Sequence, residues 1–370
     1  MRLAIVHDYL NQYGGAERVI ETLHELYPDV PIFTSIYTPK TMPDSFKGMN
    51  IKTTFMQRFP LKEKYYKYYL LFYPRAIESL DVSGYDIILS SSSSFAKGIK
   101  PGNGALHICY CYTPTRFIWN YRNYIRKEGL TRIVYKVLPL LINNLKKWDL
   151  NTVSRVNHFI AISNNIKDKI KKFYKRDSLV IYPPVDISMF EIGEETEDYF
   201  LVVSRLNSYK NIDLVVKAFN DNGHKLKIVG VGPFRKTLEE MAQGKNIEFL
   251  GRVSDDELIK LYGGCRALIF PGEEDFGITP LEAQASGRPV IAYAKGGSLE
   301  TIIEGKTGLF FRDNHPQSLK GAIEKFIEIE DSFDKKAIRE NALKFNKEIF
   351  KNNIKAFIDE KYREHTSKKT

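Results

Sequence analysis

Short apolar runs recur along the whole chain, and each is followed by a loop and a stretch of helical character. In the first half the runs cover residues 3–6, 32–37, 86–89, 107–112 and 159–163. In the second half they cover residues 200–203, 227–229, 247–250, 267–270 and 289–293. Such runs, alternating with helices, are typical of buried parallel strands joined by crossover helices. The sequence therefore predicts an α/β protein with two doubly wound, Rossmann-like parallel-sheet domains, which bind ligands at the carboxyl ends of their strands.

The chain length and one proline pair place the domain boundary. A chain of 370 residues exceeds the usual size of a single hydrophobic core. Pro183 and Pro184 precede an acidic, irregular run, which is the best candidate for a linker. We expect a first domain over residues 1–184, a linker over 185–198 and a second domain over 199–345.

Positive charge is concentrated in the first half. Residues 1–190 carry 27 Lys and Arg against 15 Asp and Glu, whereas the remainder carries 28 against 30. This imbalance predicts an anionic partner, either nucleic acid, a membrane surface or a phosphorylated acceptor. Two stretches, 61–79 and 119–148, interleave basic and aromatic residues. They could be solvated helix faces, but their presence in one half favours an anionic membrane surface. We find no RNA- or DNA-binding motif, so we expect no nucleic-acid partner.

Cysteine usage and hydropathy indicate the compartment. Cys109, Cys111 and Cys265 form neither a disulfide framework nor a metal-site spacing, which favours a reducing environment. The apolar run at 3–6 is too short for a signal peptide, and no run approaches a membrane span. We expect a cytoplasmic protein, with peripheral attachment to the inner face of the cytoplasmic membrane as a further expectation from its basic half.

The stretch 270–297 carries the strongest indication of chemistry. A carboxylate-rich loop containing Glu274 follows an apolar run, and a helix begins at Thr279. A strand, a glycine-containing loop and a helix N-terminus together suit an anionic ligand, because free backbone N–H groups point at it. Glu282 has a structural explanation, a capping box with Thr279 and with Pro280 in the first turn. Glu274 has no such structural explanation. It stands in a cluster of acidic residues, and clustering like charges costs energy unless the charges have a function.

Other glycines and cations sit in equivalent loops after predicted strands. Arg205 and Lys210 flank the loop before a helix that starts at 212, and two cations there suit a diphosphate, although a solvated surface pair would have the same spacing. Gly230 and the pair at 296–297 allow a backbone to approach a ligand closely. Gly14 and Gly15 follow the first strand, where they form either a tight turn or a phosphate cradle.

The residues EEDFGITPLEA, 273–283, resemble the glutamate–seven residues–glutamate signature of retaining GT-B glycosyltransferases of family 4 and group 1. The form EDFGITPLEA most resembles the GDP-mannose-dependent mannosyltransferases of O-antigen and exopolysaccharide synthesis. The resemblance implies a GT-B fold, in which two domains face a central cleft, and a last helix, 346–370, that crosses back to the first domain.

The same resemblance assigns roles in donor binding. It implies that Glu274 holds sugar hydroxyls, that Glu282 holds the ribose, and that Arg205 and Lys210 neutralise the diphosphate. Backbone groups of the loop and helix start would hold the sugar and phosphate, and those of the 252–253 segment would hold the base; these residues are Phe276, Gly277, Ile278, Thr279, Arg252 and Val253.

In the first half, the resemblance covers the glycine pair and the passage CYCYTPTRFIW, 109–119. It implies that Gly14 and Gly15 approach the donor diphosphate and that the acceptor site includes Gly15, Ala16, Tyr112 and Arg116. Tyr112 stands where the family usually has histidine, so no imidazole assists catalysis there. His107, within an apolar run, is expected to be a core histidine with satisfied hydrogen bonds.

These observations together predict a retaining mannosyltransferase that acts on a lipid-linked or polysaccharide acceptor in bacterial surface-glycan synthesis. The catalytic candidates are Glu274, Arg205 and Lys210. The sequence has no D-x-D motif and no metal-ligand cluster, so we expect neither a metal nor another cofactor. Three alternatives stay open: a UDP- or ADP-sugar-dependent transferase of the same fold, a non-catalytic nucleotide-sugar-binding protein, and a membrane or nucleic-acid adaptor.

Overall fold

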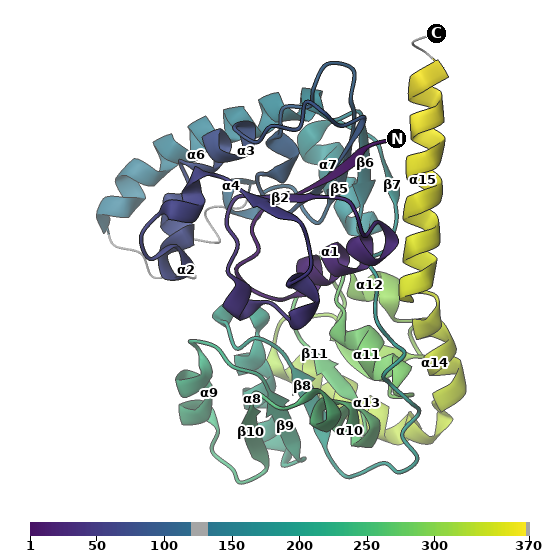
Figure 1. The fold of residues 1–370 in the computed structure, drawn as a ribbon. Coiled ribbons are helices and arrows are strands. Elements are labelled where there is room, and N and C mark those ends of the chain that lie inside the picture. The colour runs from purple at the N-terminus through teal and green to yellow at the C-terminus, as the bar shows by residue number, and fades with distance from the viewer. Residues whose placement is uncertain (120–131, 368–370) are drawn as a thin grey trace. The chain divides into compact units, whose positions relative to one another are not determined.

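The structure, a computed structural model, describes residues 1–119 and 132–367, with the side chains at 64, 67 and 132–140 excepted. The chain divides into two compact units. The first contains Met1–Pro184 and Glu348–Thr370, and the second contains Val185–Lys347. Each unit is built on a parallel β-sheet of its own (Figure 1). The two doubly wound α/β domains expected from the alternating pattern are thereby confirmed.

The first unit holds a seven-stranded sheet in the order β3-β2-β1-β4-β5-β6-β7. Its strands are β1 (Leu3–His7), β2 (Ile32–Thr34), β3 (Ile51–Thr53), β4 (Ile87–Ser92), β5 (Leu106–Cys111), β6 (His158–Ala161) and β7 (Ser178–Val180). Its helices include α1 (Gly15–Leu26), α2 (Lys62–Tyr65), α3 (Tyr73–Glu78), α4 (Arg116–Trp119), α6 (Arg132–Thr152), α7 (Asn164–Tyr174) and α15 (Lys347–Ser367). The central strands β1, β4 and β5 are buried along their whole length, as expected for a sheet covered on both faces.

One strand extends further than the apolar pattern predicts. The apolar run ends at residue 89, but β4 continues to Ser92. The hydroxyl groups of Ser90 and Ser91 are satisfied by histidines of the neighbouring strands, with Ser90 Oγ 2.8 Å from His107 Nε2 and Ser91 Oγ 3.0 Å from His7 Nδ1. A small polar side chain can occupy a central strand when it has such a partner.

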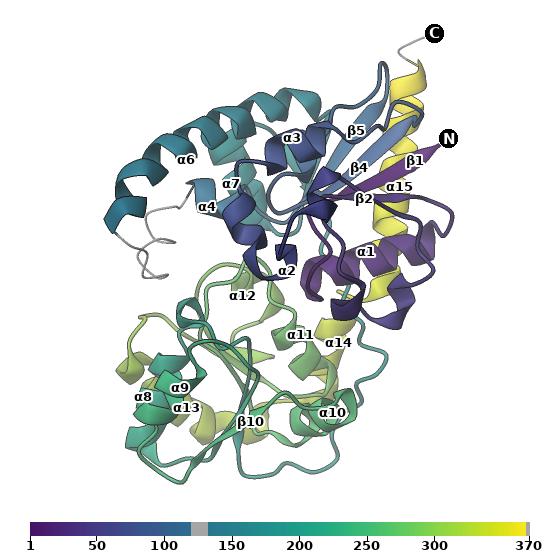
Figure 2. The same ribbon diagram turned by 60° about the vertical axis from the view of Figure 1, so that its left-hand side comes forward.

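The last helix, α15, packs against the rest of the first unit (Figure 2). The side chains that it buries are apolar: Phe350, Ile354, Phe357 and Ile358. The ring of Phe350 contacts that of Tyr110 on β5, with centroids 5.7 Å apart. Lys351 forms an ion pair of 2.9 Å with Glu25 of α1. Both α6 and α15 contain 21 residues, yet none of the helices in the described ranges combines the length and hydropathy needed to cross a bilayer.

The second unit holds a six-stranded sheet in the order β10-β9-β8-β11-β12-β13. Its strands are β8 (Phe200–Val203), β9 (Leu226–Val229), β10 (Ile247–Gly251), β11 (Leu268–Phe270), β12 (Val290–Tyr293) and β13 (Gly308–Phe311). Its helices are α8 (Ile212–Asn222), α9 (Arg235–Met241), α10 (Asp255–Gly264), α11 (Thr279–Ala285), α12 (Ser298–Thr301), α13 (Pro316–Ile329) and α14 (Lys335–Leu343). The chain starts this sheet at β8, builds outward to β10, and then returns to place β11 on the other side of β8. This reversal creates a crevice at the carboxyl ends of β8 and β11, where doubly wound sheets bind ligands.

The segment 185–198, which we expected to be a linker, is packed into the second unit. Val185, Ile187 and Phe190 are buried. The guanidinium of Arg288 donates hydrogen bonds to the carbonyl oxygens of Gly193 and Glu195. An irregular acidic run can belong to a folded unit when side chains satisfy its backbone in this way. The partner residue lies about a hundred positions away, so local composition could not reveal it.

Candidate active site

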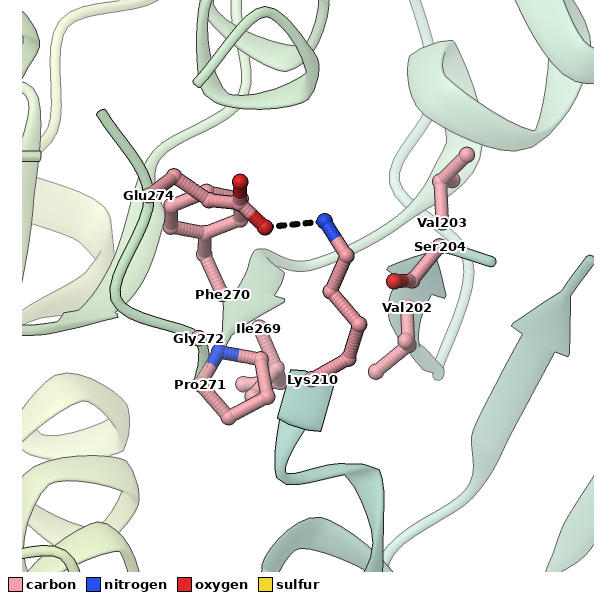
Figure 3. Close-up of a pocket in the computed structure, with 9 residues that line it drawn as sticks. All are labelled: Val202, Val203, Ser204, Lys210, Ile269, Phe270, Pro271, Gly272 and Glu274. Atoms are coloured by element: carbon pink, nitrogen blue, oxygen red, sulfur yellow. Dashed lines mark hydrogen bonds and ion pairs between the residues drawn. The ribbon is translucent and has the colours of Figure 1, made fainter. Parts of the chain in front are cut away.

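A small pocket occupies the crevice at the carboxyl ends of β8 and β11 (Figure 3). Its walls come from the last residues of the two strands and from the loops that follow them. The lining residues are Val202, Val203, Ser204, Lys210, Ile269, Phe270, Pro271, Gly272 and Glu274. The stretch singled out in the sequence therefore supplies four of these residues, from Phe270 to Glu274, while the end of β8 and the loop before α8 supply another four, from Val202 to Lys210.

Lys210 and Glu274 face each other across the pocket and form an ion pair through Nζ and Oε1 (Figure 3). Lys210 ends the 3₁₀ turn Ser208–Lys210 after β8, and Glu274 lies in the loop after β11. Their side chains are 16% and 19% exposed, so the pair is largely shielded from water, which strengthens its attraction. Lys210 thus compensates the charge of Glu274, which the sequence alone left unexplained.

The Gly296–Gly297 pair holds the carboxylate loop in place. The Gly297 N–H donates a hydrogen bond of 2.8 Å to the carbonyl oxygen of Glu274. Gly296 has a φ of 71°, and a Cβ atom there would lie 2.2 Å from that same oxygen. The contacts of this glycine pair are with the loop's own backbone, and the close approach of a ligand that we expected there stays a prediction. The absence of side chains at both positions is therefore explained by the packing of the loop that carries Glu274.

The start of α11 offers backbone donors beside the ion pair. In the described part of the chain, no hydrogen bond is made by the N–H groups of Gly277, Ile278 and Thr279. The helix has Pro280 in its first turn, and Ile278 at the N-cap position provides no side-chain cap. The first N–H groups of a helix have no intrahelical acceptor, so these groups can bind ligand oxygens.

Glu282 does not form the capping box that its spacing suggested. Thr279 is the first residue of α11 rather than its cap, so its hydroxyl cannot play the reciprocal capping role. Glu282 is only 5% exposed, and its Oε2 accepts a 2.8 Å hydrogen bond from the hydroxyl of Tyr262 on α10. This contact ties α11 to α10, and the ribose-binding role of Glu282 stays a prediction.

The other expected donor-binding residues lie in loops at the same edge of the sheet. Arg205 is exposed in the loop after β8, while Arg252 and Val253 follow β10. Gly230, after β9, has a φ of 134°, and a Cβ there would lie 1.8 Å from the carbonyl oxygen of Ser204. Gly230 therefore allows the loops after β8 and β9 to pack closely. Of the donor-binding residues expected from the sequence, the structure brings Lys210 and Glu274 into direct contact.

In the first unit, the expected acceptor residues gather at the carboxyl ends of β1 and β5. Gly14 precedes α1 as its N-cap, without a side-chain cap, and Gly15 begins the helix. The Tyr112 hydroxyl lies 2.8 Å from Ser91 Oγ and donates a hydrogen bond of 3.2 Å to the carbonyl oxygen of Ala16. Burial raises the pKa of Tyr112 well above its usual value, which keeps the phenol protonated. Tyr112 thereby fixes the start of α1, and Arg116 is exposed on α4.

Sequence reasoning missed a buried polar cluster at this edge of the first sheet. His7, at the end of β1, lies 3.6 Å from Glu17 through Nε2, in addition to its bond to Ser91. The Asp8 carboxylate accepts hydrogen bonds of 2.6–2.9 Å from four consecutive backbone N–H groups, those of residues 93–96. The signal in the sequence is the polar pair His7-Asp8, which directly follows the first apolar run.

His107 is a core histidine, as expected. It is fully buried, and its Nδ1 lies 2.9 Å from the carbonyl oxygen of Arg155, so both ring nitrogens have partners. Burial lowers the pKa of His107 to about 4 because the charged ring would lose its hydration. The ring is therefore neutral at physiological pH and has a structural role.

The sequence matches two family models, one over each unit of the chain. Residues 13–189 match the family described as Glycosyltransferase Family 4, and residues 184–345 match the family described as Glycosyl transferases group 1. The chain belongs to the glycosyltransferases of family 4 and group 1. Together the two matches cover both units of this glycosyltransferase.

Several curated relatives of this glycosyltransferase are named for the sugar that they transfer. It is 31% identical to the O-antigen chain mannosyltransferase RfbU of Salmonella typhimurium over 195 residues, which cover 50% of this chain and 55% of RfbU. It is 32% identical to the D-rhamnosyltransferase WbpZ of Pseudomonas aeruginosa over 207 residues, 51% of this chain and 54% of WbpZ. The match thus spans about half the length of these relatives. The α-1,3/1,6-mannosyltransferase ALG2 of Saccharomyces cerevisiae is 25% identical over 81% of this chain and 71% of ALG2.

Solved structures show that the fold of this glycosyltransferase is GT-B. The structure of Anabaena HepE in complex with UDP has a TM-score of 0.70, with 16% identity, and covers 97% of this chain and 100% of HepE. Sucrose-phosphate synthase from Thermosynechococcus elongatus has a TM-score of 0.73, with 17% identity, and covers 98% of this chain and 100% of the synthase.

Proposed function

We propose that this glycosyltransferase transfers mannose from GDP-mannose, with retention of the anomeric configuration, to a lipid-linked or polysaccharide acceptor in bacterial surface-glycan synthesis. The observation that carries the proposal is the Lys210–Glu274 ion pair at the crevice of the second sheet. In a sugar nucleotide the sugar is bonded directly to the terminal phosphate. A carboxylate that grips sugar hydroxyls and a cation that grips that phosphate must therefore lie side by side.

The proposed mechanism follows from the charges that develop during transfer. Cleavage of the anomeric bond builds positive charge on the sugar and negative charge on the departing diphosphate. Lys210 and Arg205 neutralise the diphosphate, and the N–H groups at the start of α11 donate hydrogen bonds to sugar and phosphate oxygens. Glu274 holds the sugar hydroxyls, so the anomeric carbon stays next to these donors while the bond breaks.

The acceptor hydroxyl attacks on the face of the leaving group. A diphosphate oxygen takes the acceptor's proton as the new glycosidic bond forms, so the transfer needs no side-chain base. In this mechanism the protein's fixed cations take the place of a divalent ion. Within the described ranges, no group of three His, Cys, Asp or Glu side chains is arranged to hold a metal, and metal independence stays a prediction.

The names of the relatives support mannose as the sugar, since RfbU and ALG2 are mannosyltransferases. A GDP-linked donor is proposed from the resemblance of residues 274–283 to GDP-mannose-dependent enzymes. The solved HepE structure contains UDP, so UDP-sugars are the first alternative to exclude, followed by ADP-sugars.

A thermal-shift screen of GDP-, UDP- and ADP-sugars tests the donor. A ligand that binds only the folded protein stabilises it by about 2.7 kcal/mol at a hundred times its dissociation constant. We expect GDP-mannose to raise the melting temperature more than the other donors, and mannose to be released or transferred from it. A larger shift with UDP- or ADP-sugars would overturn the GDP assignment. Binding of GDP-mannose with neither hydrolysis nor transfer to added glycans would overturn the enzymatic proposal in favour of a binding protein.

A further inference from the structure

Exposed apolar side chains gather on one short segment of the first unit, between β3 and β4. Of the 17 large apolar side chains that are exposed in the described ranges, six lie within residues 55–72. We call them the aromatic surface; they are Phe55, Leu61, Tyr65, Tyr68, Leu71 and Phe72. Soluble proteins scatter such side chains singly, and a cluster of them marks a contact site.

The aromatic surface is the outer face of an ordered segment. Met56 and Tyr73, at its two ends, are 0% and 1% exposed and belong to the core of the first unit. The ring of Phe59 lies 5.1 Å from that of Phe72, and the hydroxyl of Tyr69 donates a 2.7 Å hydrogen bond to the Pro60 carbonyl oxygen. The partly buried side chains of Phe59, Tyr66, Tyr69 and Leu70 pack against the core of the first unit. They anchor the turns on both sides of α2 (Figure 1), so the outer side chains are exposed by the fold.

Basic residues accompany the aromatic surface. Residues 52–75 contain six Lys and Arg against one acidic residue, Glu63. Arg58 and Arg75 are exposed, and Lys62 is partly exposed. The combination of exposed apolar and positively charged side chains narrows the class of partner that this segment can bind. A second copy of the chain would present the same positive charge and be repelled, whereas an anionic surface would be attracted.

We propose that the aromatic surface docks on a bilayer that contains anionic lipids. Tyr, Phe and Leu side chains enter the boundary between headgroups and acyl chains, while Arg58, Lys62 and Arg75 contact lipid phosphates. Long basic side chains fit such a boundary, because their aliphatic stems lie on apolar surface while their charged ends reach the headgroups. Docking does not depend on the proposed transferase activity, but it would place the first unit where a lipid-linked acceptor is found.

Vesicle co-sedimentation of the full chain, without a sugar donor, tests the proposal. The probes are vesicles of phosphatidylcholine alone and vesicles with about one third phosphatidylglycerol, at about 0.1 M and about 0.5 M salt. We expect binding to the anionic vesicles at low salt, with binding at least about tenfold weaker at high salt or without phosphatidylglycerol. An absence of binding to anionic vesicles at low salt would overturn the proposal.

Two matched double variants locate the contact. Tyr68 and Leu71 are 74% and 50% exposed, so Tyr68→Ser with Leu71→Ser should leave the fold intact and weaken vesicle binding about tenfold. Leu299 and Ile303 in the second unit are 53% and 42% exposed, and their serine double variant should bind like the wild type. Equal losses in both variants, or no loss in the first, would contradict the assignment. A dimer in gel filtration that only the first variant abolishes, without vesicle binding by the wild type, would identify a second copy as the partner instead.

Discussion

The ion pair between Lys210 and Glu274 explains why a charged side chain stands at each of these two positions. Glu274 stands between two other acidic residues in the loop after β11, and Lys210 supplies the nearby countercharge. The pair offers a ligand both a negatively charged and a positively charged group. A substitution of either residue therefore affects the site through charge and through the orientation of the remaining partner.

We expect Glu274→Gln to reduce sugar transfer by about two to three orders of magnitude. The amide keeps the size of the side chain but loses the charge that orients Lys210 and holds sugar hydroxyls. Lys210, only 16% exposed, loses its countercharge in this variant, so the free energy of unfolding should fall by about 1–3 kcal/mol. Transfer rates and donor-induced thermal shifts measure the two effects. Glu273→Gln, a change at the exposed neighbouring carboxylate, is the control and should retain activity. Wild-type transfer rates in Glu274→Gln would refute the role of Glu274.

Tyr112, which stands where the family usually has histidine, has a structural role in the fold. The structure uses the Tyr112 hydroxyl to connect Ser91 on β4 with the first turn of α1. A phenol reaches further than an imidazole from the same backbone position, so the substitution changes which groups it can contact. Through its hydrogen bond to Ala16, Tyr112 supports the helix start that follows Gly14 in the expected acceptor site. A contact between Tyr112 and the acceptor stays a prediction.

At the scale of elements, the sequence predicted best where local chemistry decides. The cap of α7 (Asn164–Tyr174) is Ser163, whose side chain accepts a hydrogen bond from the N–H of Ile166, and serine is among the residues preferred at this position. Ser254 caps α10 in the same way, through the N–H of Glu257. In contrast, β4 extends beyond its apolar run and the capping box predicted at α11 does not form. In both cases a partner distant in sequence, a histidine or Tyr262, overrode the local preference.

The packing of Gly296 against the carboxylate loop makes a matched prediction possible. Gly296→Ala and Gly305→Ala place a side chain at nearly the same left-handed backbone angle, φ 71° and 76°. Each should cost about 1 kcal/mol of stability for that reason alone. At Gly305 the new Cβ has nothing within 4 Å, whereas at Gly296 it would lie 2.2 Å from the Glu274 carbonyl oxygen. Only Gly296→Ala should therefore displace the loop and abolish donor-induced thermal stabilisation. Equal donor responses in the two variants would show that this contact does not position the site.

At the scale of the whole molecule, two separate parallel sheets explain why the chain carries two sets of loops. Each sheet reverses its strand order once, between β1 and β4 in the first unit and between β8 and β11 in the second. Each reversal creates a crevice at the carboxyl ends of the strands. The buried cluster around His7 and Asp8 lies at the first crevice, and the Lys210–Glu274 pair lies at the second.

The position of α15 predicts which unit its core residues stabilise. Phe350 is 2% exposed and contacts Tyr110, so Phe350→Ala should destabilise the first unit by about 3–5 kcal/mol. Both tryptophans of the chain, Trp119 and Trp148, belong to the first unit, so their fluorescence reports its unfolding. Ile349→Ala, at a neighbouring residue that is 40% exposed, is the control. The donor-induced stabilisation of the second unit should be unchanged in both variants. An unchanged fluorescence transition in Phe350→Ala would mean that α15 contributes little to the first unit.

The sequence by itself determined the class of the fold, most of the strands and helices, and the loop that carries Glu274. These follow from short-range properties, namely apolar runs, helix caps and a resemblance concentrated in a few consecutive residues. Only the tertiary structure decided that Lys210 is the partner of Glu274, that the glycine pair at 296–297 packs against the loop that carries Glu274, and that the segment 185–198 is part of the second unit. Each of these depends on contacts between residues far apart in the chain, and a pattern read along one sequence carries no information about which distant groups will satisfy a charge or a hydrogen bond.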